Sequence, residues 1–169
     1  MRSTLSIDVH AAAEAVFSLA RDIERWPALL PHYLRVRALE RHADGSLVAE
    51  MLAVRTFVPV IGLGVPIVWR ARTWNEPRAR RLRFVHRGGA TAGMDVTWRI
   101  EPIADGCRVS IEHDFRPALP GPLGPAWAGF VDRLFVRPVA SRTLATFKAI
   151  AEATADVWSD PAAPTNPTP

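Results

Sequence analysis

A short stretch in the middle of the chain alternates arginine and tryptophan. Residues 68–74 read VWRARTW, and the side chains of a β-strand point alternately to its two faces. Arg70, Arg72 and Trp74 therefore share one face, and Trp69 and Ala71 lie on the other. An arginine inside an apolar interior needs an acidic partner or a ligand oxyanion, because an unpaired buried charge costs several kcal/mol. Either arginine, if it points inward, could thus stabilise a developing negative charge. Burial preference alone instead turns Trp69 and Ala71 inward and both arginines towards water.

A histidine occupies an apolar strand face further along the chain. Residues 109–115, VSIEHDF, place Val109, Ile111, His113 and Phe115 on the same side. An imidazole in that position can act as a general acid or base near neutral pH. The alternative is a hydrogen-bonded histidine of the core.

Several aromatic and sulfur-containing side chains are candidates to line or close a cavity. Aromatic walls suit planar hydrophobic ligands, and the single tyrosine could orient one through its hydroxyl. The alternative is that these side chains simply fill the core. The candidate ligand-binding residues are Trp26, Tyr33, Trp69, Trp74, Arg87, Met94 and Trp98.

Motifs for other kinds of chemistry do not occur. The five histidines lack the spacing of metal ligands, and one cysteine, Cys107, excludes an internal disulfide and a cysteine-based zinc site. No Ser-His-Asp order, glycine-rich phosphate loop or paired-carboxylate motif is found. We therefore expect neither a metal nor a cofactor.

The elements that must position these side chains follow from hydrophobic periodicity. Alternation with period two predicts a first strand over residues 3–9, and helical spacing predicts a helix over residues 11–21. Pro27 and Pro31 punctuate a second short helix. Six strands follow, and their turns include Asp44-Gly45 and Asp105-Gly106, both typical of hairpins.

The last element predicted is a long helix over residues 126–157. Pro138 lies inside it and should kink it near Leu134, whose carbonyl loses its hydrogen-bond donor. A curved antiparallel sheet must cover its concave face, and only this helix is long enough to do so. One apolar helix stripe cannot fill such an interior, so we expect a cavity.

Composition fits a single domain of ordinary globular character. The chain has 169 residues, 49% of them hydrophobic and 22% charged, and we expect residues 1–158 to form one domain. Residues 159–169 are rich in proline and are predicted to be a disordered tail. No signal peptide or membrane-spanning segment is recognisable, which indicates a cytoplasmic protein.

Charge gives a weaker indication of partners. The net charge is +4, but the arginines are spread along the chain except for a cluster at residues 78–87. The simplest interpretation of this cluster is a solvated hairpin. We expect no nucleic-acid binding and no stable membrane association.

Three stretches resemble the polyketide cyclase/dehydrase branch of the START-like (SRPBCC) helix-grip superfamily. They are VFSLARDIERWPALLPHYLRVRALER, GMDVTWRIEPIADGCRVSIEHDF and RTLATFKAIAE, and the resemblance covers roughly residues 4–155. It implies an α+β helix-grip fold: a seven-stranded curved antiparallel sheet wrapped around a long C-terminal helix, with two short helices after the first strand.

In the single-domain aromatase/cyclases of this branch, a buried arginine on the fourth strand is implied to polarise a carbonyl. A gapless alignment places Trp74 at that position. The family register turns the face of Arg70 and Arg72 inward, opposite to the orientation that burial preference favours. The sequence leaves both orientations open, and Arg70 or Arg72 could supply the missing charge.

The resemblance implies two classes of function. As an enzyme, the protein would close and dehydrate the rings of a poly-β-ketone delivered by an acyl carrier protein, with Arg72, Arg70 and His113 as catalytic residues. As a binding protein, it would only carry a lipid, quinone or aromatic molecule. An acidic carrier would dock on Arg78, Arg80 and Arg81 near the cavity mouth, and the protein would be a monomer or homodimer.

Overall fold

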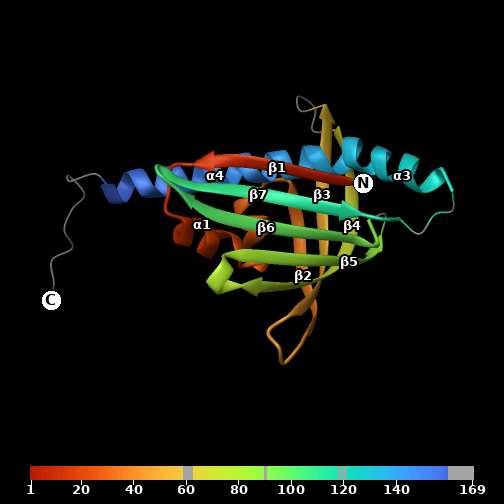
Figure 1. Ribbon diagram of the computed structural model, residues 1–169, viewed down its shortest axis with the longest axis horizontal. Coiled ribbons are helices and arrows are strands. Elements are labelled where there is room, and N and C mark those ends of the chain that lie inside the picture. The colour runs from red at the N-terminus through yellow and green to blue at the C-terminus, as the bar shows by residue number, and fades with distance from the viewer. Residues whose placement is uncertain (59–62, 90, 118, 120, 160–169) are drawn as a thin grey trace.

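The computed structural model describes residues 1–58, 63–89, 91–117, 119 and 121–159. A first strand is followed by short helices, then by six strands and a long interrupted helix (Figure 1). The strands are β1 (Arg2–Val9), β2 (Tyr33–Arg41), β3 (Leu47–Val58), β4 (Leu63–Glu76), β5 (Arg81–Gly89), β6 (Met94–Ile103) and β7 (Gly106–Phe115). The helices are α1 (Ala13–Ala20), α2 (Trp26–Leu29), α3 (Leu123–Val131) and α4 (Arg137–Ser159), with 3₁₀ turns η1 (Ile23–Arg25) and η3 (Pro77–Ala79) and a π-helical turn η4 (Asp132–Val136).

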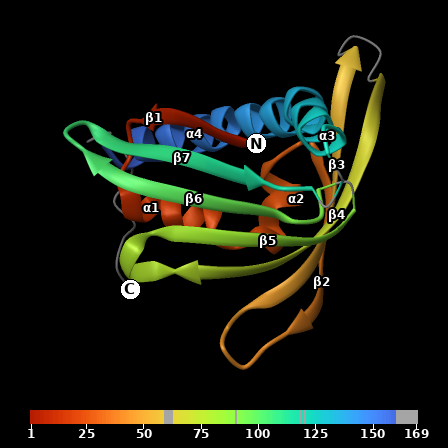
Figure 2. The same ribbon diagram turned by 45° about the vertical axis from the view of Figure 1, so that its right-hand side comes forward.

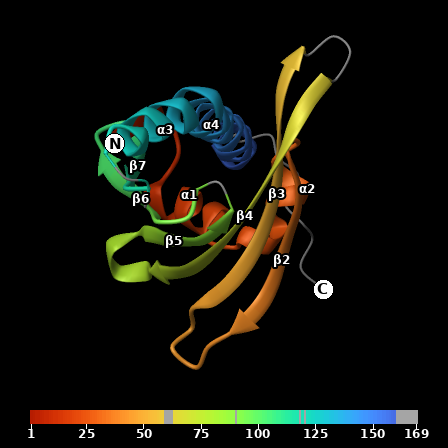
Figure 3. The ribbon, with the colours of Figure 1, turned by 90° about the vertical axis from the view of Figure 1, so that its right-hand side faces the viewer.

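The seven strands form one antiparallel sheet in the order β1-β7-β6-β5-β4-β3-β2. Consecutive strands are neighbours throughout, except that β1 lies at the far edge beside β7. The sheet bends around α3 and α4, and α1 and α2 lie within the same curve (Figure 3). The predicted helix-grip architecture is confirmed.

The period-two patterns place the core correctly. β6 buries Met94, Val96, Trp98 and Ile100, and β7 buries alternate residues from Cys107 to Phe115. The predicted turns at Asp44-Gly45 and Asp105-Gly106 join β2 to β3 and β6 to β7 (Figure 2).

The terminal helix differs in detail from the prediction. It starts at Leu123 rather than residue 126, and its irregularity is a π-helical turn instead of a simple kink. Pro138 has no backbone N–H to offer the Leu134 carbonyl. The backbone N–H of Arg137 bonds the carbonyl of Asp132, five residues earlier, which widens the turn. The predicted tail lies outside the described residues from residue 160 onwards.

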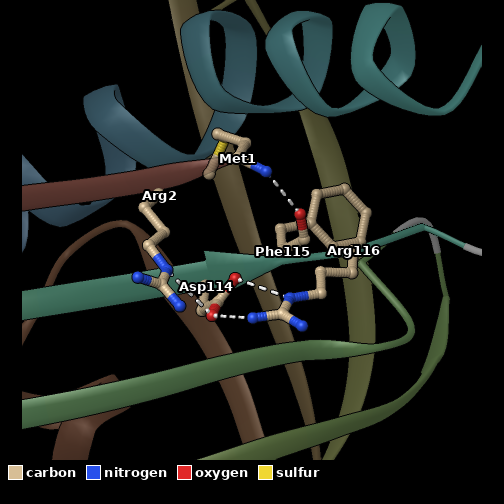
Figure 4. A network of polar contacts seen from close by, with 5 residues as sticks. All are labelled: Met1, Arg2, Asp114, Phe115 and Arg116. Atoms are coloured by element: carbon tan, nitrogen blue, oxygen red, sulfur yellow. Dashed lines mark hydrogen bonds and ion pairs between the residues drawn. The ribbon is translucent and has the colours of Figure 1, made fainter. Parts of the chain in front are cut away.

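The edge strand β1 is joined to β7 by backbone and side-chain contacts (Figure 4). The amino group of Met1 donates to the carbonyl oxygen of Phe115 at 2.7 Å. Asp114 accepts from Arg116 and Arg2, at 3.1 and 3.2 Å, and these guanidinium groups lower the pKa of its carboxyl. In the described part of the chain, no helix is long and apolar enough to cross a membrane.

Candidate functional site

A cavity of about 90 Å³ lies between the inner face of the sheet and α4. Its walls are mainly aromatic and aliphatic side chains, and the polar groups among them belong to histidine, threonine and tyrosine. No Asp, Glu, Lys or Arg is among the described residues that line it. The interior is therefore suited to an uncharged molecule, because a charged group would find no counter-ion there.

The mouth of the cavity can be located from the exposure of its lining residues. Ile67, Phe135 and Val139 are half-buried, and every other lining residue is buried. The opening therefore lies between the first half of β4 and the junction of η4 with α4. Residues 59–62, which connect β3 to β4, lie outside the described residues.

Trp26 is the centre of the aromatic wall. Its ring centroid lies 5.1 Å from Tyr33, 5.4 Å from Trp98 and 5.9 Å from both Phe84 and Phe147. Its indole N–H donates to the carbonyl of Ala20 at 2.9 Å, so the polar end of the ring is satisfied. This wall presents flat apolar faces.

Six of the candidate site residues line the cavity, as expected. They are Trp26, Tyr33, Trp69, Met94, Trp98 and His113. The chain positions of these residues range from 26 to 113, so only the folded sheet brings them together.

The placement of Arg70 and Arg72 corrects the family-based expectation. Trp69 and Ala71 are buried, so the alternating arginines lie on the outer face of the sheet. Arg70 pairs with Glu50 at 3.1 Å, and Arg72 pairs with Asp44 at 2.6 Å. Neither guanidinium reaches the cavity, and burial preference predicted the orientation of this strand correctly.

Trp74 and Arg87 are also outside the cavity. Trp74 shares the outer face, where the guanidinium carbon of Arg83 lies 5.5 Å from its ring centroid. Arg87 is exposed on β5, next to the inward-facing His86. Both residues were expected to bind ligand, but the alternation of side chains along β4 and β5 points both away from the cavity.

His86 is the cavity residue that the sequence analysis missed. It follows Leu82 and Phe84 at period two on β5, with Arg83 and Val85 between them. Its Nδ1 is hydrogen-bonded to Thr91 Oγ1 at 2.7 Å. Burial, together with a smaller effect of the nearby His113, lowers the pKa of His86 to about 3.

His113 faces the same cavity from β7. Its Nδ1 is buried and has no hydrogen-bond partner. Burial lowers its pKa to about 4, partly opposed by the carboxylate of Asp132 and assisted by Arg137. Both imidazoles are therefore neutral at pH 7, and the one on β7 has an unused polar atom.

A third polar group joins the helix to β2. Thr143 on α4 donates its hydroxyl hydrogen to the Val139 carbonyl and lies 2.8 Å from His32 Nε2. Because that hydrogen is used, His32 must donate from Nε2, which leaves its buried Nδ1 without a partner. Burial raises the pKa of the neighbouring Tyr33 hydroxyl above its usual range.

The arginine-rich turn between β4 and β5 lies far from the mouth. Figures 1 and 2 place it at the opposite end of the sheet from α3. Ile67 and Glu76 are nine positions apart on β4, or about 30 Å at roughly 3.3 Å per residue. Arg78, Arg80 and Arg81 therefore do not adjoin this opening, and docking of a carrier on them stays a prediction.

These features define a helix-grip protein of the START-like class with an internal, uncharged aromatic cavity. The chain belongs to the family described as polyketide cyclase / dehydrase and lipid transport, which it matches over residues 1–152. It is 28% identical over 120 residues to the granaticin polyketide synthase bifunctional cyclase/dehydratase of Streptomyces violaceoruber, which covers 69% of this chain. The chain spans only 35% of the length of that relative.

Solved structures give the same placement. The Zhui aromatase/cyclase from Streptomyces sp. R1128 superposes with a TM-score of 0.75 at 17% identity, covering 94% of this chain and 98% of that one. The di-domain ARO/CYC BexL from the BE-7585A biosynthetic pathway gives 0.67 at 25% identity, covering 95% of this chain and 48% of that one. The family and fold expected from the sequence are thus confirmed.

Proposed function

We propose that the protein binds an uncharged polyketide-type molecule in its cavity and promotes aldol cyclisation and dehydration there. The observation that carries this proposal is the presence of two neutral histidines, His86 and His113, on a mainly aromatic and aliphatic wall without charged residues. Membership of the polyketide cyclase / dehydrase family and the names of the relatives support an enzyme role.

The ring closure needs one proton to be removed and one to be delivered. A methylene carbon between two carbonyls loses a proton to an imidazole nitrogen, and the resulting carbanion attacks a distant carbonyl carbon to form the new C–C bond. The carbonyl oxygen then takes a proton from the imidazolium and becomes a hydroxyl. Two histidines near each other can divide these tasks, and each returns to its neutral form.

Dehydration follows with the same groups. A neighbouring carbon loses a second proton to an imidazole, and the hydroxyl leaves as water after receiving a proton from an imidazolium. No oxidant or reductant is required. In this protein, neutral imidazoles take the place expected for an arginine, since Arg70 and Arg72 face outward.

The aromatic wall determines which conformation reacts. Trp26, Trp69 and Trp98 present flat faces that favour a folded, planar chain over an extended one. The cavity as it stands has room for only a few water molecules, so a multi-ring ligand requires side chains at the mouth to move.

The test uses a poly-β-ketone bound to an acyl carrier protein, with the cyclised products separated by chromatography. His86→Gln and His113→Gln should each lower the rate of product formation by about 10²-fold or more, the usual contribution of general acid–base catalysis. Binding of an uncharged aromatic product should remain within a few-fold of wild type. His42→Gln, at an exposed histidine, is the matched control.

The second candidate function is carriage of a hydrophobic molecule without chemistry, which the lipid-transport part of the family description favours. It is the correct assignment if both histidine variants and the wild type give identical product mixtures while tight binding persists. An acyl carrier protein stays a candidate partner of the enzyme.

A further inference from the structure

α3 is a surface helix without a polar side chain. Its sequence is LGPAWAGFV, and its buried residues are Gly124, Ala128 and Val131. On its other face, Leu123 is 61% exposed and Phe130 is 48% exposed. A surface helix normally carries polar residues towards solvent, and one that is apolar all round is usually covered by something.

The exposed side of α3 is continuous with the cavity mouth. Trp127 stacks on Phe130 with ring centroids 5.5 Å apart and planes 20° apart. Phe130 in turn meets Phe135 edge to face at 6.2 Å. Since Phe135 is on the rim of the cavity, an unbroken aromatic path leads from α3 to the opening. Figures 1 and 2 show α3 at one end of the molecule, on the helical side of the sheet.

Two basic residues of the same segment have no acidic partner in the described part of the chain. Residues 115–151 contain five basic residues, and three of them, Arg116, Arg137 and Lys148, pair with Asp114, Asp132 and Glu152. Arg133 and Arg142 are exposed and have no acidic partner among the described residues. Asp132 is buried and held by Ser3 and Arg137 at 3.0 and 2.7 Å, so it is not available at the surface.

Arg133 is the basic residue closest to the apolar face in sequence, three positions after Phe130. It is exposed and has no acidic partner in the part of the chain that the structure describes. Exposed apolar side chains beside an unpaired basic residue match the two contributions to binding at a lipid–water interface, buried apolar area and attraction to anionic lipid. Tryptophan is enriched at that depth because its ring is apolar and its N–H is polar.

We propose that the face formed by Leu123, Trp127, Phe130 and Arg133 docks transiently on an anionic lipid surface. The three apolar side chains enter the boundary between headgroups and acyl chains, and Arg133 meets the phosphates. The contact places the cavity mouth against the lipid, so an apolar molecule could enter or leave without crossing water. The proposal does not depend on the chemistry inside the cavity.

Two other occupants fit the observations less well. A second copy of the chain would bring the exposed Arg133 side chains of both copies close together, and like charges oppose that contact. An acidic protein would satisfy the arginine, but α3 offers no side-chain hydrogen-bonding group except the Trp127 indole to fix its position.

The experiment measures co-sedimentation of the full chain with vesicles. One set contains phosphatidylcholine alone, and the other contains equal parts of phosphatidylcholine and phosphatidylglycerol. We expect binding to the anionic set only, weakened by added salt. The double variant Leu123→Ser/Phe130→Ser should reduce that binding by about tenfold or more, and Arg133→Ser by about fivefold.

The matched control is Leu34→Ser/Leu39→Ser, which removes two exposed leucines from β2, away from α3, and should leave vesicle binding unchanged. Circular dichroism checks that every variant is folded. Absence of binding to anionic vesicles overturns the proposal. So does a dimer that the α3 variant abolishes without vesicles present, or protection of α3 from hydrogen exchange by an acidic carrier protein alone.

Discussion

His32, His86 and His113 are buried and neutral, with pKa values lowered to about 4, 3 and 4. Desolvation is the main cause for all three. In the unfolded chain each imidazole would titrate near its ordinary value of 6.5. The folded state therefore binds fewer protons than the unfolded state between about pH 6.5 and pH 4.

This difference predicts the pH dependence of stability. Because the unfolded chain gains protons first, stability should be constant above the unfolded pKa and fall as pH decreases from 6.5 towards 4. Each unit of pKa difference corresponds to about 1.4 kcal/mol per histidine. His86→Gln should make the decline shallower, as measured by urea unfolding at several pH values. The exposed-residue variant His42→Gln should keep the wild-type slope; equal slopes in all three proteins would contradict the prediction.

Thr143 supports a second prediction at this scale. Thr143→Val keeps the shape of the side chain but removes the partner of His32, whose other nitrogen is already unpaired. We expect the free energy of unfolding to fall by about 1–3 kcal/mol, the cost of a buried polar group left unsatisfied. Thr146→Val removes the same type of bond to the helix backbone from a less buried position. If both variants lose equal stability, the His32 contact is not important.

Individual site residues were predictable only where one face of a strand was clearly apolar. His113 stands in line with Val109 and Ile111, so its inward direction followed from alternation. On β4, both faces contain large side chains, and periodicity could not choose between Trp69 and Arg70. Burial preference favoured Trp69, and the folded sheet agrees with it: Arg70 and Arg72 pair with Glu50 and Asp44 on the outer face.

Among the elements, the β6–β7 turn depends on a glycine that no other residue can replace. Gly106 has φ +129°, and a Cβ there would lie 2.1 Å from the carbonyl oxygen of Val9, at the end of β1. The absence of a side chain at Gly106 thus lets the start of β7 approach the end of β1 closely. Asp-Gly predicted the hairpin, but the contact with β1 depends on tertiary structure.

Gly106→Ala should lower the free energy of unfolding by at least about 3 kcal/mol, since backbone strain and an overlap between backbone atoms add together. Gly45→Ala is the control. Gly45 has φ +79° with nothing within 4 Å of the added carbon, so only the strain of about 1–2 kcal/mol applies. Thermal or denaturant unfolding measures both, and equal losses would show that the overlap is relieved by movement of β1.

The interrupted helix shows where element prediction stops. Pro138 indicated the position of the irregularity, because proline has no backbone N–H and the carbonyl four residues earlier therefore loses its hydrogen bond. Whether the helix bends at this point or forms a wider turn depends on the side chains that it packs against. Here the wide turn accompanies burial of Asp132 against Ser3 of β1 and places Phe135 and Val136 on the cavity.

At the scale of the whole molecule, the cavity links ligand binding to stability. An uncharged aromatic ligand at 100 times its dissociation constant should stabilise the fold by about 2.7 kcal/mol, which raises the melting temperature by roughly 5–10 °C. A matched ligand that carries a carboxylate should give little shift, because the described lining offers no cation.

Filling the cavity should remove this shift. Ala140 lines it from α4, and Ala140→Phe should abolish the ligand-induced change while costing about 1–3 kcal/mol of stability through overpacking. Ala145→Phe places the same ring on the exposed side of α4 and should retain the full shift. A shift that survives in the filled variant would place the ligand elsewhere.

The pairing of β1 with β7 has a consequence for how the chain is made. Residues 2–9 pair with residues 107–114, so about a hundred residues must be synthesised before the first strand can meet its partner. At about 5–20 residues per second, β1 waits several seconds with an open edge while β2 to β6 assemble. Sheets with such distant pairings also fold slowly. Within this domain, the strand that is synthesised first is thus among the last to be protected, and a chaperone would be most useful in the interval before β7 emerges.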